Sequence, residues 1–267
     1  MRDEALELAL APWRLGLTAT PSEEPGAFLR LTELVGPVTF RLGIDDLAGT
    51  WLAGLDHLVL SLPLGPAERR AHARDRARFA AFARPFRAAR PEAGWEELLR
   101  AARASAEGQR AIAAWRRAER LLAYTSAKAE VLARLLRRHA GQRTLVFVAT
   151  NEVAYRVARE HLVMPITCHV GRAERAWALQ AFERGELRAL VSARVLDEGL
   201  DVPAADVAIV VGGSGGARQH TQRAGRVLRP APGKRATLYE LVAADTPEER
   251  RGRARRSGLP RSSGGSP

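Results

Sequence analysis

Short apolar runs alternate with helical segments through the second half of the chain, and this alternation limits the fold more than any other feature. Five runs are rich in β-branched and aliphatic residues: "RTLVFVAT", "PITCHV", "LRALVSA", "ADVAIVVG" and "ATLYELVA". Stretches with helical spacing separate them, beginning with "SAKAEVLARLLRRHAG", which opens on Ser126 as a capping residue. Strands that alternate with helices predict an α/β fold with a parallel, doubly wound sheet covered on both faces.

The carboxyl ends of such strands predict where ligands bind. In open parallel sheets, ligands lie beyond the carboxyl ends of the strands. Three loops leave those ends here, after Thr150, after Ser192 and after Gly213. We therefore expect functional side chains in these three loops.

The first part of the chain is organised differently. "PWRLGLTATP" predicts a strand followed by a turn, "AFLRLTELVG" a short helix, and "GPVTFRL" and "HLVLSLPL" two further strands. Residues 66–121 have helical spacing throughout and form an insertion. Residues 248–267 are polar and basic, with Gly, Ser and Pro, which predicts disorder.

The chain is strongly basic, with a net charge of +12 and a pI of about 11.2. One interpretation is a polyanionic partner, most simply nucleic acid. The other is a coding bias, because only Lys128 and Lys234 are lysines and the rest of the basic residues are arginines. The helical insertion carries 14 arginines against 7 acidic residues, which fits either a DNA grip or a solvated basic surface.

Several classes of protein are excluded or disfavoured. No apolar run reaches the roughly 18 residues that span a membrane, and the first residues lack the order of a signal peptide. A single cysteine, Cys168, permits no internal disulfide and fits a cytoplasmic protein. The six histidines show no metal-ligand spacing with Cys168, so we expect no metal site.

The stretch "GARQHTQRAGRVLRP" places Gln222, Arg226 and Arg229 at spacings of four and three. On a helix these three side chains share one stripe, next to Gly225. The stripe fits a phosphate-bearing ligand, because guanidinium groups offer fixed, forked donors to phosphate oxygens. An ordinary basic helix that faces nucleic acid or solvent is the alternative.

Four segments resemble conserved motifs of superfamily 2 helicases, in the right order. "RLGLTATP" resembles motif III, "TLVFVAT" motif IV, "LVSARVLDEGLDVPAADVAIVV" motif V and "QHTQRAGRVLRP" motif VI. With "LVGPV" and "GGSGGARQ", the set most resembles the XPB-type DNA helicases of repair and transcription, over residues 1 to about 245. The resemblance implies RecA-like lobes and makes the insertion 66–121 similar to that family's helical thumb.

The resemblance also implies roles in nucleotide binding. It makes Arg226 and Arg229 arginine fingers that stabilise charge on the γ-phosphate, and it places Gln222 at the nucleotide. Gly199 and Asp201 would face the nucleotide side, or Asp201 would couple to motif VI, with a turn acid that caps the next element as the alternative for Asp201.

Further positions are implied for coupling and for DNA. Thr18 and Thr20 would couple nucleotide state to lobe closure, with a plain strand-end turn as the alternative. Ser192 and Arg194 would lie near the nucleic-acid backbone. Thr150 and Arg172 are candidates for phosphate contacts, against simple capping or surface roles.

The sequence lacks two parts of a complete motor. No segment matches the phosphate loop G-x-x-x-x-G-K-[ST], and Asp3-Glu4-Ala5-Leu6 follows no apolar strand, so it is not expected to bind Mg²⁺. "SEEPG" stands where the family often has an Arg-Glu-Asp element. We therefore expect a C-terminal helicase half, with ATP and Mg²⁺ bound mainly by a missing first lobe supplied in cis or in trans.

The expected domains follow from this assignment. Residues 1–54 would be the remnant of the first lobe, residues 55–247 the second lobe with its insertion, and residues 248–267 a basic tail. The alternative function is a non-catalytic nucleic-acid-binding protein derived from a helicase.

We predict that residues 1–267 alone do not hydrolyse ATP, since no nest of backbone N–H groups holds the β- and γ-phosphates. Addition of a first lobe, fused or in trans, should restore DNA-stimulated turnover. Arg226→Ala or Arg229→Ala should then reduce kcat by roughly 10³ or more, with nucleotide affinity changed less. A coupled phosphate-release assay measures both, and Mg²⁺-dependent hydrolysis by the purified chain that is lost in those same variants would contradict the prediction.

Overall fold

The computed structural model describes residues 7, 11, 13–16, 25–40, 54–193, 205–212 and 235–249. The chain divides into two compact units, residues 1–47 and residues 48–267.

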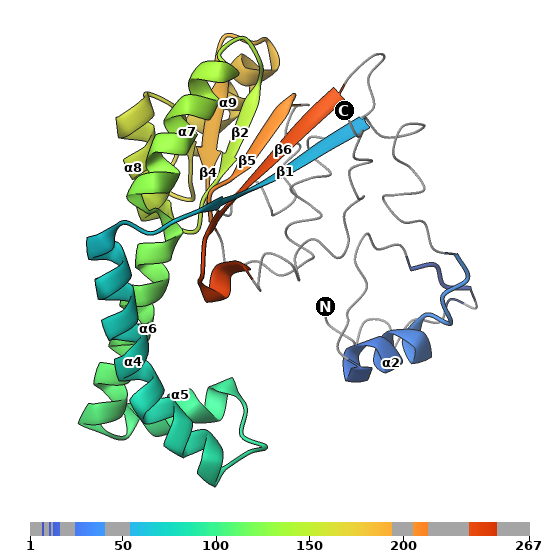
Figure 1. Cartoon of the computed structure of the whole chain (residues 1–267). Helices are drawn as coiled ribbons and strands as arrows, with labels where there is room; N and C mark the ends of the chain where they lie inside the picture. The colour runs from blue at the N-terminus through green and yellow to red at the C-terminus, as the bar shows by residue number, and fades with distance from the viewer. Residues whose placement is uncertain are drawn as a thin grey trace, which may run out of the picture. The chain divides into compact units, whose positions relative to one another are not determined.

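Among the described residues of the second unit, six strands form one sheet in which every pair of neighbours is parallel, in the order β1-β6-β5-β2-β4-β3 (Figure 1). The strands are β1 (Gly54–Leu62), β2 (Thr144–Phe147), β3 (Met164–Ile166), β4 (Ala189–Ser192), β5 (Val207–Val210) and β6 (Arg235–Ala243). This sheet confirms the predicted parallel α/β fold. Each expected strand from residue 143 onward is present, although several are shorter than their apolar runs.

The central strands β2, β4 and β5 are buried on both faces, as their continuous apolar runs predict, whereas Leu58 and Val59 of the edge strand β1 are each 40% exposed. On one face, Val146, Val191 and Ile209 pack against α7 (Ser126–Arg138) and α8 (Asn151–His161). The alternate residues Leu145, Leu190 and Ala208, which point to the other face, are also fully buried. A third helix, α9 (Arg172–Glu183), lies between β3 and β4 in the chain, and a left-handed Gly185 follows it.

Side chains that cap the helices set where they begin. The Thr125 hydroxyl accepts a hydrogen bond from Lys128 N at 3.3 Å, so Thr125 caps α7 and the expectation for Ser126 was wrong by one residue. Ser126 instead forms the first turn, where its own N–H bonds to the Glu68 carboxylate. Thr150 caps α8 in the same way, through Val153 N.

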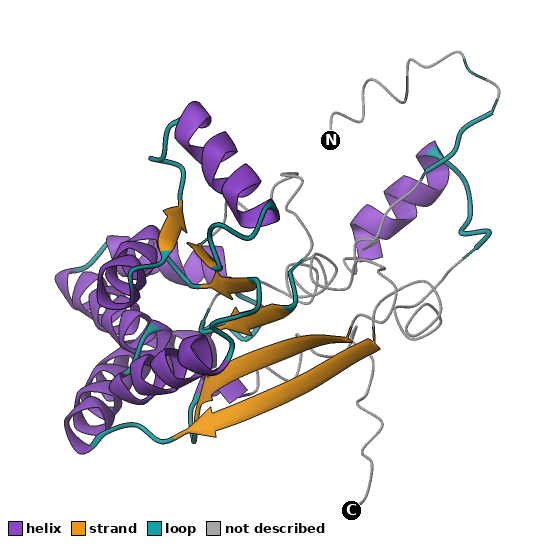
Figure 2. Cartoon of the chain, turned by 90° about the horizontal axis from the view of Figure 1, so that it is seen from above, coloured by secondary structure: helices purple, strands orange, loops and turns teal. Residues whose placement is uncertain are grey.

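The insertion is a set of three helices, here called the arm: α4 (Pro66–Ala89), α5 (Trp95–Arg103) and α6 (Ala106–Ala123). In Figure 1, α4 and α6 lie side by side and run away from the sheet, and Figure 2 gives the view from above, with helices in purple and strands in orange. Phe79, Leu98 and Ile112 form a core of the arm's own, next to the rings of Trp95 and Trp115, which lie 4.9 Å apart and tilted by 57°. An added Cβ at Gly108 would lie 2.4 Å from the Ala102 backbone, so α5 and α6 can meet there only at a glycine.

The first unit contains α2 (Pro25–Leu34), which confirms the expected short helix. The expected strands at 12–21 and 36–42 are absent where they are described, because Trp13–Gly16 and residues 36–40 have no strand conformation. Trp13 is 90% exposed and Phe40 75% exposed. A strand needs neighbours to satisfy its backbone, and no strand is found among the described residues of this unit.

A buried ion pair joins α7 to the segment after β6. Lys128 is fully buried, and its ammonium donates to both oxygens of Glu248, at 2.8 and 2.9 Å, and to Leu122 O at 2.7 Å. Glu248 also accepts from Ala243 N at 2.8 Å. Glu248 is also buried, at 5% exposure, so removal of either charge leaves the other one buried.

Lys128→Ala should therefore lower the free energy of unfolding by about 3–5 kcal/mol, the usual cost of a buried charge that loses its partner. Arg134→Ala is the matched control, because its pair with Glu130 is exposed at 72% and 70% and should contribute below about 1 kcal/mol. Urea denaturation followed by circular dichroism compares the two. Equal losses in both variants would contradict the prediction.

Candidate functional site at the carboxyl edge of the sheet

Three neighbouring strands, β4, β2 and β5, end side by side at one edge of the sheet. Backbone hydrogen bonds continue past the strands, from Val148 N to Ser192 O and from Val211 N to Phe147 O, each at 2.9 Å. These bonds hold the starts of the three loops together. The expected convergence of the loops after Thr150, Ser192 and Gly213 is thus built into the sheet, as far as their first residues are described.

Thr150 is exposed at the first turn of α8. Its hydroxyl accepts from Val153 N at 3.3 Å, so the capping role is present in the structure. The next residue, Asn151, donates from its amide to the exposed Cys168 sulfur at 3.1 Å. The start of α8 and the loop after β3 therefore form one polar surface at the carboxyl edge, and phosphate contact by Thr150 stays a prediction.

Arg175 organises that surface and was not identified from the sequence. Its guanidinium donates to Thr167 O at 3.2 Å and to Val170 O at 2.9 Å, which fixes the loop between β3 and α9. The Thr167 hydroxyl also bonds to Tyr155 at 2.7 Å. Arg172, one turn earlier on α9, is exposed at the same loop and is free of these internal contacts. The only available signal in the sequence was the i, i+3 spacing of these two arginines.

Ser192 is the last residue of β4 and is fully buried. Its hydroxyl has no hydrogen-bond partner among the described residues, and its side chain lies on the same sheet face as Phe147. Ser192 is therefore at the expected edge with its side chain directed inward. Its role near a nucleic-acid backbone stays a prediction.

The other predicted site residues lie outside the described residues. These are Gly199 and Asp201, Arg194, the coupling residues Thr18 and Thr20, and the stripe of Gln222, Arg226 and Arg229. Their roles stay predictions.

The arm presents a dense basic surface. Of its arginines, all but the half-buried Arg76 are exposed. Arg70, Arg74 and Arg78 follow one another at i, i+4 spacing along the exposed side of α4. Like charges at this spacing repel each other and destabilise a helix slightly, and an anion at the surface would relieve that repulsion. The arm is thus suited to bind a polyanion.

One acidic side chain inside the arm is buried and paired. Asp75 on α4 accepts from Arg117 on α6, at 2.8 Å to Nη2 and 3.3 Å to Nε. The hydrogen bonds from Arg117, with the charges of Arg74 and Arg78, hold the pKa of Asp75 below its usual value, although burial opposes this. The pair crosses between α4 and α6 and fixes their register.

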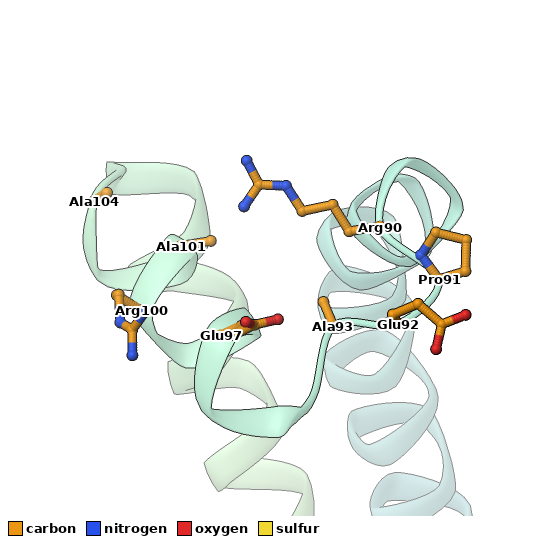
Figure 3. A pocket seen from close by; sticks show the side chains of 8 residues that line it. All are labelled: Arg90, Pro91, Glu92, Ala93, Glu97, Arg100, Ala101 and Ala104. Atoms are coloured by element: carbon orange, nitrogen blue, oxygen red, sulfur yellow. The ribbon is translucent and has the colours of Figure 1, made fainter.

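An open notch of about 550 Å³ lies at the end of the arm, between the loop 90–93 and α5 (Figure 3). The Arg90 side chain extends toward α5, and the Glu97 carboxylate points toward the same gap. Two arginines and two glutamates line the notch, together with alanines and a proline. The charges balance, so the notch is not suited to bind a phosphate group.

Two further observations apply to the described part of the chain. None of its helices is both long and apolar enough to cross a membrane. No group of three or more His, Cys, Asp or Glu side chains is placed there to hold a metal ion.

Comparison with known proteins agrees with this geometry. The model of the helicase conserved C-terminal domain family matches residues 127–231. The DNA 3'-5' translocase XPB2 of Sulfurisphaera tokodaii is 33% identical over 252 residues, which is 94% of this chain and 57% of that protein. The DNA 3'-5' helicase XPB of Mycobacterium tuberculosis is 28% identical over 87% of this chain and 36% of its own length.

A solved structure shows the same fold. The helicase domain of Pyrococcus furiosus Hef superposes with a TM-score of 0.57 at 18% identity, over 88% of this chain and 65% of that one. This chain thus spans between about a third and somewhat over half of the two sequence relatives.

The Asp75–Arg117 pair predicts a pH dependence for the stability of the arm. Because the pKa of Asp75 is lowered by folding, its contribution is complete above the unfolded value near 4 and is lost as pH falls through the folded value. Asp75→Asn should cost about 1 kcal/mol at pH 7 and little at pH 2. Thermal melts of both proteins over this pH range measure the gap.

The control for this series is Glu186→Gln, which removes a carboxylate from an exposed pair with Arg184. It should leave the melting temperature nearly unchanged at every pH. A gap between Asp75→Asn and the unaltered chain that stays constant from pH 7 to pH 2 would refute the assignment to Asp75 ionisation.

Proposed function

This chain is a C-terminal half of an XPB-type helicase, and from this premise we propose that it is the motor half of an ATP-dependent DNA helicase or translocase. The observation that carries the proposal is the arrangement of strands and arm at one edge of the sheet. Three parallel strands end there side by side, and the arginine-rich arm begins and ends at the same edge. Such an edge is where open parallel sheets bind ligands.

The residues proposed for the nucleotide are Arg226, Arg229 and Gln222, together with Gly199 and Asp201. They follow the ends of β5 and β4, so the described sheet brings the starts of both segments to the ligand-binding edge. Bound ATP with Mg²⁺ would supply the phosphoryl group whose hydrolysis drives movement. The two arginines would stabilise its developing negative charge from across a cleft, while the first lobe holds the phosphates and the metal ion.

The residues for DNA are the exposed arginines of the arm and the polar edge that includes Thr150 and Arg172. Arginine contacts to phosphates carry no base information, so binding should show little sequence preference. The arm has its own core and thus presents these charges on a stable scaffold. Thr18 and Thr20 would report nucleotide state to the lobe interface.

A second candidate is a non-catalytic nucleic-acid-binding protein that retains the fold. The lack of a phosphate loop in this sequence favours it, since the arm alone could bind DNA without any motor. ATP turnover after the first lobe is supplied, as described above, distinguishes the two functions.

We expect DNA affinity to fall by orders of magnitude between low and moderate salt, because bound arginines release counterions from the phosphates. Replacement of Arg70, Arg74 and Arg78 together by glutamine should reduce the affinity for DNA about tenfold or more. It should also reduce the slope of log K against log salt concentration by about 2 to 3. Fluorescence anisotropy with a labelled duplex measures both quantities. Deletion of residues 66–121 should weaken binding further and leave the sheet folded.

The matched control replaces Arg134, Arg137 and Arg138 by glutamine. These exposed arginines lie on α7, and the change removes the same charge from outside the arm. Its effect should be much smaller. Equal effects of the two triple variants would show that net charge alone, and not the arm, determines binding.

A further inference from the structure

The two chain segments that connect the arm to the sheet are hydrogen-bonded to one carboxylate, that of Glu68. The chain enters the arm through Gly65 and leaves it before Ser126. Glu68 accepts a hydrogen bond from Gly65 N at 3.0 Å through one oxygen and from Ser126 N at 2.8 Å through the other. The first turn of α4 and the first turn of α7 are thereby held side by side.

A second tie fixes the arm to the sheet. Lys128 Nζ reaches back to Leu122 O, in the last turn of α6, and forward to Glu248, which is itself bonded to Ala243 N at the end of β6. The ammonium thus joins the arm, α7 and the sheet at one point. The ammonium, a compact charge, lies within hydrogen-bond distance of three oxygens, and this position is a lysine in a chain whose basic residues are almost all arginine.

Two more contacts surround the same joint. The Tyr124 hydroxyl donates to Glu160 at 2.8 Å, and the Arg156 guanidinium lies 4.8 Å from the centre of its ring. Burial and the neighbouring Glu160 raise the pKa of Tyr124, so the phenol keeps its proton and remains a donor. On the sheet side, an added Cβ at Gly212 would lie 2.9 Å from Ala123 O, so the end of β5 meets the arm at a glycine.

We propose that Lys128 and Glu248 are positioning residues that hold the arm at one angle to the carboxyl edge of the sheet, so that arm and edge bind a single duplex as one preformed surface. The DNA part of this inference rests on the proposed function, whereas the fixed angle does not. Four separate contacts converge on the joint from α4, α7, α8 and the ends of β5 and β6. Two surfaces that are held in register bind together without a further ordering cost.

The fixed angle can be measured in the chain itself. Cys168 is exposed and lies beside the sheet, so one added cysteine, Ala104→Cys at the end of α5, gives a pair of spin-label sites. Pulsed electron–electron double resonance should give a narrow distribution of distances between the two spin labels. The double substitution Lys128→Met with Glu248→Gln removes the charge pair without leaving either charge buried alone, and it should broaden that distribution at least twofold.

The control is Arg143→Met with Asp206→Asn. It likewise removes one ion pair, with Nε and Oδ2 3.7 Å apart, from the start of β2 and the approach to β5, at the opposite edge of the sheet. The distribution should stay narrow in this variant. Far-ultraviolet circular dichroism confirms that each variant is folded. A distance distribution that is unchanged by the Lys128 and Glu248 substitutions overturns the proposal that this ion pair holds the arm at one angle.

The positioning role is measured with two duplexes. The Lys128 and Glu248 double variant should lose about tenfold in affinity for a duplex of about 30 base pairs, which reaches both surfaces, and less than twofold for one of about 10 base pairs. The Arg143 and Asp206 variant should lose less than twofold for both. If the distance distribution broadens while the affinity for the long duplex is unchanged, the positioning role is overturned. If the unaltered chain does not bind DNA, the proposed function itself is refuted.

Discussion

Parallel pairing of all six strands is the constraint on which the rest of the molecule depends. Because neighbouring strands run in the same direction, their carboxyl ends meet at one edge, and each connection must cross back over a face of the sheet. Among the described crossings, α7 and α8 cover one face of the sheet, and the central strands are apolar on both sides. The same geometry gathers the loops after β2, β4 and β5 and both ends of the arm at one edge. Fold and candidate site therefore follow from one backbone pattern.

The arm follows a different rule, because its stability comes from its own packing. Phe79, Leu98 and Ile112 fill its centre, and Asp75 with Arg117 sets the register of its two long helices. Apart from Arg117, which pairs with Asp75, the exposed arginines of the arm lie outside its apolar core and give its outer surface a positive charge. This separation of an apolar interior from a basic exterior allows one insertion to be both stable and strongly positive.

Local sequence patterns were sufficient to predict the strands of the sheet, but not the side-chain contacts that connect the helices to it. Strands such as Val207–Val210 are apolar on both sides and short, which identifies them directly. The α7 cap was misplaced because Thr125 and Ser126 are both capping residues, and only the contact from Glu68 distinguishes them. Lys128 and Glu248 are 120 residues apart, and no local pattern relates them. The strand expected at residues 36–42 depends on neighbours, which sequence spacing cannot supply.

The shared carboxylate of Glu68 has a consequence for how such chains can diversify. Glu68 holds the two ends of the arm close together. The chain therefore leaves for the insertion and returns from it at nearly the same place, as it would in a tight turn. The entropy of closing a loop grows only slowly with its length, and here closure is secured at the base. Arms of other lengths and surface chemistry could therefore be exchanged between Gly65 and Ser126 without a change in the sheet.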